Sequence, residues 1–408
     1  MNYDVIVVGG GPAGMMAAIT AGNAGCRVLL LERNESLGKK LRITGKGRCN
    51  VTNHCSAGEV LQHVPRNSRF LFSAMNAFPP EAAMEFFTQH GCQLKVERGN
   101  RVFPVSDQSA SVLQALQRAL GQSGTTIRQG RVQSILTIDG RVSGVSCQKQ
   151  TFLAPKVVLA TGGCSYPLTG STGDGYRLAE AVGHTIVPPT GSLVPLEVAG
   201  QDCPDMQGLS LRNVAVTLRD GKGKAAFQDF GELLFTHFGV SGPTVLSASA
   251  HMSGPGPYRL ILDLKPALEE GKLDARLLRD LEQYKNRTME HAMADLLPRS
   301  MIPVLLRRAG IPPELAANSL TREQRRALLK QMKELELEIT GKRPVEEAIV
   351  TSGGVRVSEV NPKTMESKKL PGLFLAGEIL DCDAYTGGFN LQIAWATGFC
   401  AGKSENCV

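Results

Sequence analysis

Residues 4–14, DVIVVGGGPAG, constrain the fold of this chain more than any other stretch. The β-branched run at residues 5–8 is typical of a strand buried on both faces, and the small residues after the glycines predict a helix packed closely against it. Gly9, Gly11 and Gly14 match the GxGxxG spacing, which permits a tight turn, close approach of a pyrophosphate and close helix packing. This stretch therefore predicts a dinucleotide site in a Rossmann-type α/β fold.

A second predicted strand strengthens this interpretation. Residues 27–31, RVLLL, are strand-like, and the strand ends at Glu32, eighteen residues after Gly14. An acidic residue at this point can hold the ribose hydroxyls of a dinucleotide. A purely structural glycine turn is the alternative, and the motif alone does not distinguish FAD from NAD.

Composition limits the class of protein. A chain of 408 residues with 42% hydrophobic residues can form two or three ordinary domains. Its apolar runs have the length of strands, so no segment is expected to span a membrane. The first residues form a predicted core strand rather than a signal peptide, which predicts a cytoplasmic protein. Ten cysteines without a CxxC pair argue against a zinc site, and no metal is predicted.

A basic, glycine-rich stretch follows the second strand. Residues 34–53 lack helical or strand periodicity, which is typical of a long functional loop. The loop contains Lys39, Lys40, Arg42, Lys46 and Arg48. These cations predict that the loop covers something anionic, and a solvated basic loop is the alternative. The net charge of +7 permits an anionic partner without requiring one.

Changes in pattern divide the chain into three predicted domains. Alternating polar and apolar residues between glycine turns indicate a β-rich region, and helical periodicity follows it. Strand-like sequence then returns near the C-terminal end. The predicted boundaries are 1–190 plus 348–408 for the nucleotide-binding domain, 191–265 plus about 342–347 for the β-rich domain, and 266–341 for a helical insertion.

Two further stretches give weaker expectations. Residues 126–147 predict a small antiparallel meander that turns at residues 139–140. Residues 272–343 contain 15 Lys and Arg against 10 Asp and Glu, so the helical insertion has a basic bias. An ordinary solvated helical face explains this bias at least as well as an RNA-binding face.

Four stretches carry a family resemblance: GKKLRITGKGRCNVTN, LLFTHFGVSGP, TSGGV with TMESKKLPGLFLAGEILD, and DAYTGGFNLQIAWATG. Together they span the chain and resemble the HI0933-like flavoprotein family, also called the aminoacetone oxidase or BaiN/RdsA type. The resemblance implies a Rossmann-like FAD-binding domain of the two-dinucleotide-binding flavoprotein type, assembled from both ends of the chain. It also implies a β-barrel-like second domain with an inserted helical domain.

The resemblance further implies which residues hold FAD. Its assignments are Gly9, Gly11, Ala13 and Gly14 to the pyrophosphate, Glu32 to the adenosine ribose, Lys40, Leu41, Gly47, Arg48, Cys49 and Asn50 to the loop over the cofactor, Val132, Ala160, Thr161 and Gly162 to the adenine side, Gly377 and Glu378 to the closing turn, and Gly388, Asn390, Leu391 and Gln392 to the pyrimidine edge of the isoalloxazine. Arg33 is also expected to bind the cofactor. Many relatives carry Asp where this chain has Glu378, which is a small departure.

No second GxGxxG with its own strand and helix occurs in the sequence, so NADPH or NADH is expected as a transient electron donor. The resemblance implies a reductase that passes hydride from FAD to an activated C=C bond, in a uridine of 23S ribosomal RNA or in a small-molecule enone related to bile acids. Two alternatives stay open: an oxygen-dependent oxidase of a small amine such as aminoacetone, and a flavin-bearing RNA-binding factor without turnover. No membrane partner is expected, and a monomer or weak dimer is predicted.

A reductase of this kind needs a proton donor, which can be a side chain or water. Cys49 and Tyr385 are the candidate catalytic acids. A packed loop thiol is the alternative for Cys49, and a residue that stacks on substrate or walls the site is the alternative for Tyr385. His237 is a third candidate, although a hydrogen-bonded histidine supporting the β-rich domain is the stronger interpretation.

Overall fold

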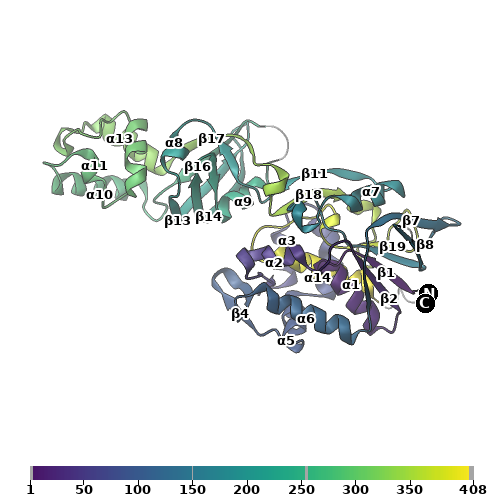
Figure 1. Ribbon diagram of the computed structural model, residues 1–408. Coiled ribbons are helices and arrows are strands. Elements are labelled where there is room, and N and C mark those ends of the chain that lie inside the picture. The colour runs from purple at the N-terminus through teal and green to yellow at the C-terminus, as the bar shows by residue number, and fades with distance from the viewer. Residues whose placement is uncertain (1–2, 149, 253–255, 404–408) are drawn as a thin grey trace. The chain divides into compact units, whose positions relative to one another are not determined.

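The computed structural model describes residues 3–148, 150–252 and 256–403, and the chain forms two compact units (Figure 1). The first unit comprises Met1–Ser192 and Val345–Val408, and the second comprises Leu193–Pro344. Two segments far apart in the sequence therefore build the first unit together. The further division of the second unit into a β-rich and a helical domain stays a prediction.

A five-stranded parallel sheet forms the centre of the first unit, with strand order β19-β10-β1-β2-β6. Its strands are β1 (Val5–Val8), β2 (Val28–Glu32), β6 (Thr126–Gln129), β10 (Lys156–Leu159) and β19 (Leu373–Leu375). Every residue of β1 is buried, as its β-branched sequence predicts for a central strand. The predicted Rossmann-type α/β fold is thus confirmed.

The meander prediction is wrong for its first strand. Thr126 pairs in parallel with Leu29 of β2, so β6 extends the main sheet. The antiparallel meander contains only β7 (Val132–Ile138), β8 (Arg141–Cys147) and β9 (Gln150–Leu153). Asp139 and Gly140 form its first turn with φ of 49° and 72°, the left-handed geometry that a two-residue hairpin requires.

Smaller sheets and helices complete the first unit. Strands β3 (Thr52–Asn53), β4 (Leu94–Glu97) and β5 (Arg101–Pro104) form one sheet, and β11 (Ile186–Ser192) pairs with β18 (Val350–Val355). The helices are α1 (Pro12–Asn23), α2 (Lys39–Ile43), α3 (Ala57–Gln62), α4 (Phe72–Ala77), α5 (Pro80–Gln89), α6 (Ser109–Gln122), α7 (Asp174–Ala181) and α14 (Phe389–Gly402).

Helices α1 and α14 pack with their backbones in contact. A Cβ atom added to Gly398 of α14 would clash with the carbonyl oxygen of Ala13, and one added to Gly402 would clash with that of Ala17. The two glycines are four residues apart, so they lie on one face of α14. This contact joins the C-terminal helix to the helix that follows the glycine turn.

The second unit is a closed six-stranded barrel with helices inserted between its last two strands. The barrel order is β12-β15-β14-β13-β16-β17. Its strands are β12 (Leu196–Val198), β13 (Ser210–Arg219), β14 (Ala225–Thr236), β15 (Gly239–Ser241), β16 (Tyr258–Asp263) and β17 (Leu335–Lys342). Its helices are α8 (Asp202–Asp205), α9 (Pro243–Ser249), α10 (Glu270–Gln283), α11 (Met289–Ala292), α12 (Ile302–Arg308) and α13 (Arg322–Lys333).

The helical prediction is wrong where β17 begins. Residues 335–341 were expected in the helical insertion, but they alternate buried and exposed along a strand. Leu335, Leu337 and Ile339 point into the barrel, and the residues between them face outward. A period of two in LELEI is the signal of a half-buried strand.

We expect Gly398→Ala to destabilise the protein, because its methyl group would force α14 away from Ala13. The free energy of unfolding should fall by about 1–3 kcal/mol. Gly121→Ala in α6 is the matched control, because no atom lies within 4 Å of the added Cβ. Denaturant unfolding of both variants measures the difference, and equal stabilities would contradict the close helix contact.

Candidate functional site

The predicted phosphate-binding turn lies between β1 and α1. Each glycine of its motif is required or tolerated for a different steric reason. Gly9 has φ of +107°, and a side chain there would clash with the carbonyl oxygen of Ala160. A side chain at Gly14 would clash with the carbonyl oxygen of Gly9. Gly11 caps the N-terminus of α1 and has no atom within 4 Å of a Cβ position. The turn thus leaves open space at a helix N-terminus, as pyrophosphate binding requires.

Glu32 ends β2 beside this turn, in the predicted place for a ribose-binding acid. The backbone N–H of Gly10 donates to Oε2 of Glu32 at 2.7 Å. The backbone N–H and the side-chain amide of Asn34 donate to Oε1 at 2.8 and 2.7 Å. These bonds fix the carboxylate against the glycine turn, which is the arrangement that a dinucleotide fold uses.

Arg33 points toward α7. Its Nη1 donates to the Thr172 hydroxyl at 2.6 Å and to Asp174 at 3.1 Å. Arg131 also pairs with Asp174, and the hydrogen bond from Arg131 lowers the pKa of that carboxyl despite burial. The guanidinium of Arg33 is therefore held by protein groups, and its contact with the cofactor stays a prediction.

Lys40 of the basic loop and Glu378 of the C-terminal turn form an ion pair, with Nζ 2.7 Å from Oε2. Lys40 also donates to the Ser165 hydroxyl at 2.6 Å, and that hydroxyl donates to Oε1 of Glu378 at 3.1 Å. The backbone N–H of Thr351 donates to the same Oε1 at 2.8 Å. The structure thus brings two predicted site residues together and links them to Ser165 and to Thr351, the first residue of the TSGGV stretch.

Arg48 of the basic loop has other partners than this ion pair. Arg48 pairs with Glu97 and Asp107, and its guanidinium lies 4.1 Å from the ring centroid of Phe103. These contacts give Arg48 a structural role in the hairpin of β4 and β5. Contact of Arg48 with a cofactor stays a prediction.

Cys49 lies in the hydrophobic core with its side chain 0% exposed. Burial raises the pKa of its thiol to about 12, with a further small rise from Cys92 and an opposing hydrogen bond with Thr44. A thiol enclosed in this way is protonated and shielded from a substrate. The placement favours the packed loop thiol over the catalytic acid.

Polar atoms without partners mark the inner side of this loop and of the β10 turn. Asn50 Oδ1 and Thr161 Oγ1 are buried and have no hydrogen-bond partner among the described residues. Buried polar atoms are rarely left unpaired, so each indicates a missing bound group or water. Leu41 of the same loop is buried, whereas a Cβ at Gly47 would meet nothing within 4 Å.

The N-terminus of α14 lies at the end of the other predicted motif. Gly388 is its N-cap with φ of +98°, and a side chain there would clash with the carbonyl group of Thr52. The following residues, Phe389, Asn390 and Leu391, have no intrahelical acceptors for their N–H groups. The helix therefore offers N–H donors and a partial positive charge at this point.

The side chains of Asn390 and Gln392 are engaged within the protein. Asn390 accepts from the Ala384 N–H at 2.9 Å and donates to the Ala384 carbonyl at 2.7 Å. Gln392 is fully buried, where it donates to the Phe78 carbonyl and accepts from the Thr52 hydroxyl, both at 2.7 Å. Any contribution of these residues to cofactor binding would thus come from the backbone of α14.

The remaining predicted residues lie at the edges of the site. Val132 begins β7 and is buried, and Gly162 has φ of +77° just after β10. A side chain at Gly377 would clash with the side chain of Ala13 on α1. Tyr385 is partly exposed in the loop before α14 and packs edge-on to His63, with ring centroids 6.0 Å apart.

Sequence analysis missed a cluster around Asp383. The segment 63–67 runs alongside the loop 381–385: the Tyr385 N–H donates to the His63 carbonyl at 3.0 Å, Arg66 pairs with Asp383 at 3.0 Å, and Asn67 donates to Asp381. The Ser192 hydroxyl donates to Asp383 at 2.6 Å. Burial raises the pKa of Asp383, although Arg66 and Ser192 oppose the rise. Only the DCD spacing hinted at this cluster.

The geometry of the first unit fits FAD. Open space at Gly11, a fixed carboxylate at Glu32 and the N-terminus of α14 match the three parts of a flavin dinucleotide. The unpaired atoms of Asn50 and Thr161 supply further polar contacts. No group of three or more His, Cys, Asp or Glu that could hold a metal occurs among the described residues.

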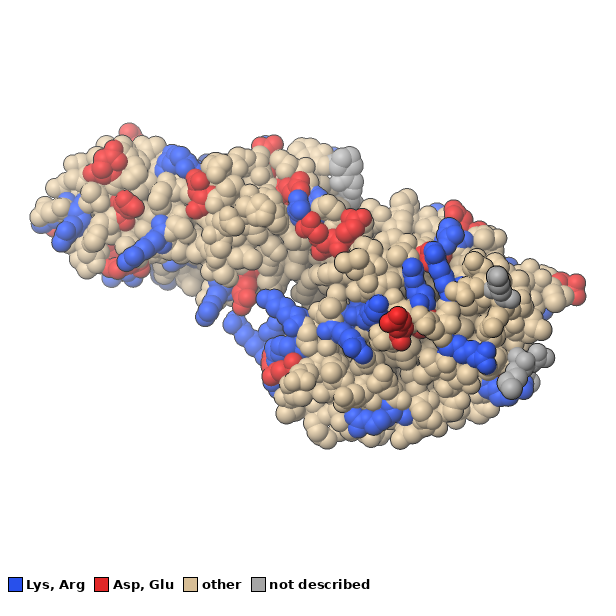
Figure 2. Space-filling view, in the orientation of Figure 1, with Lys and Arg blue, Asp and Glu red and all other residues tan. Residues whose placement is uncertain are grey.

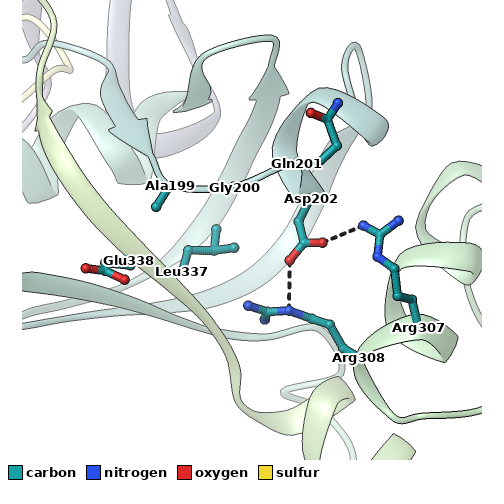
Figure 3. A pocket seen from close by; sticks show the side chains of 8 residues that line it. All are labelled: Ala199, Gly200, Gln201, Asp202, Arg307, Arg308, Leu337 and Glu338. Atoms are coloured by element: carbon teal, nitrogen blue, oxygen red, sulfur yellow. Dashed lines mark hydrogen bonds and ion pairs between the residues drawn. The ribbon is translucent and has the colours of Figure 1, made fainter.

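The second unit contains a surface hollow of about 570 Å³ (Figure 3). Asp202 lies at its rim and binds both Arg307 and Arg308, so α8 of the barrel side is tied to α12. His237 lies elsewhere in this unit, between β14 and β15, where it is exposed and packs against Phe238. The expectation of a hydrogen-bonded supporting histidine is therefore wrong within the described residues.

A family model described as the HI0933-like protein Rossmann domain matches residues 3–404. The 3-dehydro-bile acid delta(4,6)-reductase of Clostridium scindens is 33% identical over 98% of both chains. The ribosomal RNA dihydrouridine synthase of Escherichia coli is 30% identical over 98% of this chain and 96% of that protein. The crystal structure of a 3-ketosteroid-delta4-(5alpha)-dehydrogenase from Rhodococcus jostii has a TM-score of 0.51 at 17% identity, covering 99% of this chain and 97% of that chain. This last likeness concerns the fold.

No helix of the described ranges is long and apolar enough to cross a membrane.

We expect Asp383→Asn to change how stability depends on pH. The folded state raises the pKa of Asp383, so the protonated group stabilises the fold below its unfolded pKa of about 4. That contribution is lost as pH rises through the folded pKa. The free energy of unfolding of the unsubstituted protein should therefore fall relative to that of Asp383→Asn as the pH rises above about 4.

Denaturant unfolding at several pH values measures this difference. Asp139→Asn removes a carboxylate from an exposed turn and controls for the loss of one charge. The difference in free energy of unfolding between the unsubstituted protein and Asp383→Asn is the test. If it stays constant, or shifts in favour of the unsubstituted protein as pH rises, burial does not raise the pKa of Asp383.

Proposed function

The chain belongs to the HI0933-like family and is an FAD-dependent oxidoreductase, and we propose that it reduces a C=C bond conjugated to a carbonyl group. One observation carries the proposal: two relatives that match nearly the full chain act on different molecules but on one kind of bond. One is named as a delta(4,6)-reductase of a 3-dehydro-bile acid, and the other forms dihydrouridine in ribosomal RNA.

Uridine in ribosomal RNA is the substrate that we favour, and a bile-acid-like enone is the second candidate. The identities of 33% and 30% do not separate the two. The net charge of +7 over the chain favours RNA as the substrate, because RNA is a polyanion. The enone is supported by the more similar relative.

The first unit would hold FAD through its backbone more than through its charged side chains. The turn at Gly11 and the N-terminus of α1 would hold the pyrophosphate, and Glu32 the ribose. The N–H groups at the start of α14 would face the pyrimidine edge, where reduction of the flavin places negative charge. When bound, FAD supplies the hydride that reduces the substrate.

The chain's own side chains would orient the site and move the proton. The ion pair of Lys40 and Glu378 fixes the basic loop against the C-terminal turn. Tyr385 remains the candidate acid, because it is partly exposed in the loop that leads into α14, whereas Cys49 is enclosed. Asn390 holds that loop in place through the Ala384 backbone.

NADPH or NADH is the proposed electron donor. The sequence contains one GxGxxG turn of the dinucleotide type, and that turn is assigned to FAD. A nicotinamide cofactor would therefore reach the flavin from outside and leave again.

Dihydrouridine mapping of large-subunit ribosomal RNA tests the substrate in a strain that lacks the gene. We expect one dihydrouridine to be missing and to return with the unsubstituted gene. An unchanged map would exclude the RNA substrate and leave the enone. If a variant whose flavin cannot be reduced restores the missing dihydrouridine, the protein would instead be a non-catalytic RNA-binding factor.

Anaerobic mixing of the flavin-loaded protein with NADPH or NADH tests the reductase. The yellow flavin absorbance should bleach and recover when the substrate is added. Bleaching by a small amine such as aminoacetone, and by neither nicotinamide, would instead support the oxidase.

We expect Tyr385→Phe to lower kcat per bound flavin by about a hundredfold, because it removes the phenol and keeps the ring. Cys49→Ala should change kcat by less than about threefold, since a buried thiol is not the acid. Turnover with NAD(P)H, normalised to flavin content, measures both. Near-normal turnover of Tyr385→Phe would mean that water, and not Tyr385, donates the proton to the substrate.

A further inference from the structure

Two short segments of the first unit contain most of the chain's charge surplus. Residues 38–53 have five Lys and Arg and no Asp or Glu, and residues 94–107 have three Lys and Arg against two Asp and Glu. Their joint surplus of six compares with seven for all 408 residues. The net positive charge is therefore a local property.

These two segments form one surface, which we call the basic surface. Strand β3 of the first segment pairs with β5 of the second through Thr52 and Val102. The Val51 N–H donates to the Val102 carbonyl at 2.9 Å, and Arg48 reaches across to Glu97. The cations of both segments are thus held on a single, internally bonded piece of structure.

The two acids of these segments, and Glu378 beside Lys40, form ion pairs. Arg48 and Lys95 both pair with Glu97 and with Asp107, and Lys40 pairs with Glu378. Five exposed cations remain without an acidic partner in the part of the chain that the structure describes: Lys39, Arg42, Lys46, Arg98 and Arg101. Figure 2 shows Lys and Arg side chains gathered where α2 and β4 lie in Figure 1.

The backbone presents one of these cations to solvent at a cost. Gly45, Lys46 and Gly47 have φ of 57°, 57° and 86°. The left-handed region is sterically unfavourable for a lysine, whereas glycine adopts it freely. Exposed apolar side chains lie within the same segments: Ile43, Val96 and Val105.

We propose that the basic surface is where RNA docks, a step that rests on the proposed reduction of uridine in ribosomal RNA. Five uncompensated cations on two segments exceed what one carboxylate of a small enone can use, and they suit a chain of phosphates. Lys39 and Lys40 are neighbours on α2, and Lys40 contacts Glu378 of the predicted flavin turn. RNA on this surface would lie beside that turn, where a uridine can be swung out of its stack.

The helical insertion is a weaker candidate for the same partner. Arg322, Arg326 and Lys330 form an exposed stripe along α13 at a spacing of four residues. However, residues 193–344 contain 21 Lys and Arg against 19 Asp and Glu, so the surplus of the insertion is largely offset by barrel acids. The stripe therefore supplies a control of equal charge.

Filter binding to transcribed large-subunit ribosomal RNA tests the proposal with the flavin-loaded protein. The basic-surface variant carries Arg42→Gln, Lys46→Gln and Arg98→Gln, and the control carries Arg322→Gln, Arg326→Gln and Lys330→Gln. We expect the first to bind about tenfold or more weakly at about 150 mM salt and to lose about two from the slope of log K against log salt. The control should bind within about twofold of the unsubstituted protein.

Equal affinity and slope for the basic-surface variant would overturn the proposal, and so would an equal loss in the control. Failure of the unsubstituted protein to bind RNA would overturn it as well. Flavin absorbance per chain and circular dichroism show that both variants are folded. If the dihydrouridine map depends on the gene while the basic-surface variant binds normally, the docking surface is wrong and the proposed function stands. If the map is unchanged, the substrate is wrong whatever the binding result.

Discussion

The close backbone contact between α1 and α14 is the constraint on which the first unit depends. Gly398 and Gly402 let α14 lie directly on the carbonyl groups of Ala13 and Ala17. Because β19, β10 and β1 are parallel, the helix and turn that follow them start from one edge of the sheet. The contact thus sets two helix N-termini, far apart in the sequence, at the same edge, where a dinucleotide can bridge them.

The basic loop shows how one segment can serve several purposes. Residues 38–53 of this loop contain no acidic residue, so each cation there either pairs with an acid from another segment or faces solvent. Lys40 pairs with Glu378, and Arg48 pairs with Glu97 in the hairpin of β4 and β5. Lys39, Arg42 and Lys46 are exposed. Its inner side is apolar at Leu41 and Cys49. Ion pairs and buried apolar side chains thereby hold the loop in place, and its remaining cations face solvent.

Local patterns predicted the parts of the site that depend on local conformation. The strand, glycine turn and helix at residues 4–23, and Glu32 after the next strand, follow from buried β-branched residues and backbone sterics. The side-chain partners of Arg48, Asn390 and Gln392 are residues between five and 340 positions away, and no periodicity encodes them. Asp383 was missed for the same reason, because Arg66 and Ser192 come from distant segments. Strand β17 was misread because it follows directly after the helical pattern of α13, although its own apolar residues alternate with a period of two.

The residues assigned to the flavin and the exposed cations have different structural roles. This difference explains how relatives with different substrates can share one chemistry. The groups assigned to the flavin are backbone N–H donors, glycines and buried side chains, whose replacement would disturb the core. Lys39, Arg42, Lys46 and Arg98 are exposed and make no side-chain bond to the described residues, so they can change without loss of packing. Lys40 and Arg48 are more constrained, because removing Lys40 takes the cation from Glu378 and removing Arg48 breaks its ion pairs with Glu97 and Asp107. Substrate preference can therefore diverge at the exposed positions of one loop while the same loop keeps its place against the cofactor turn.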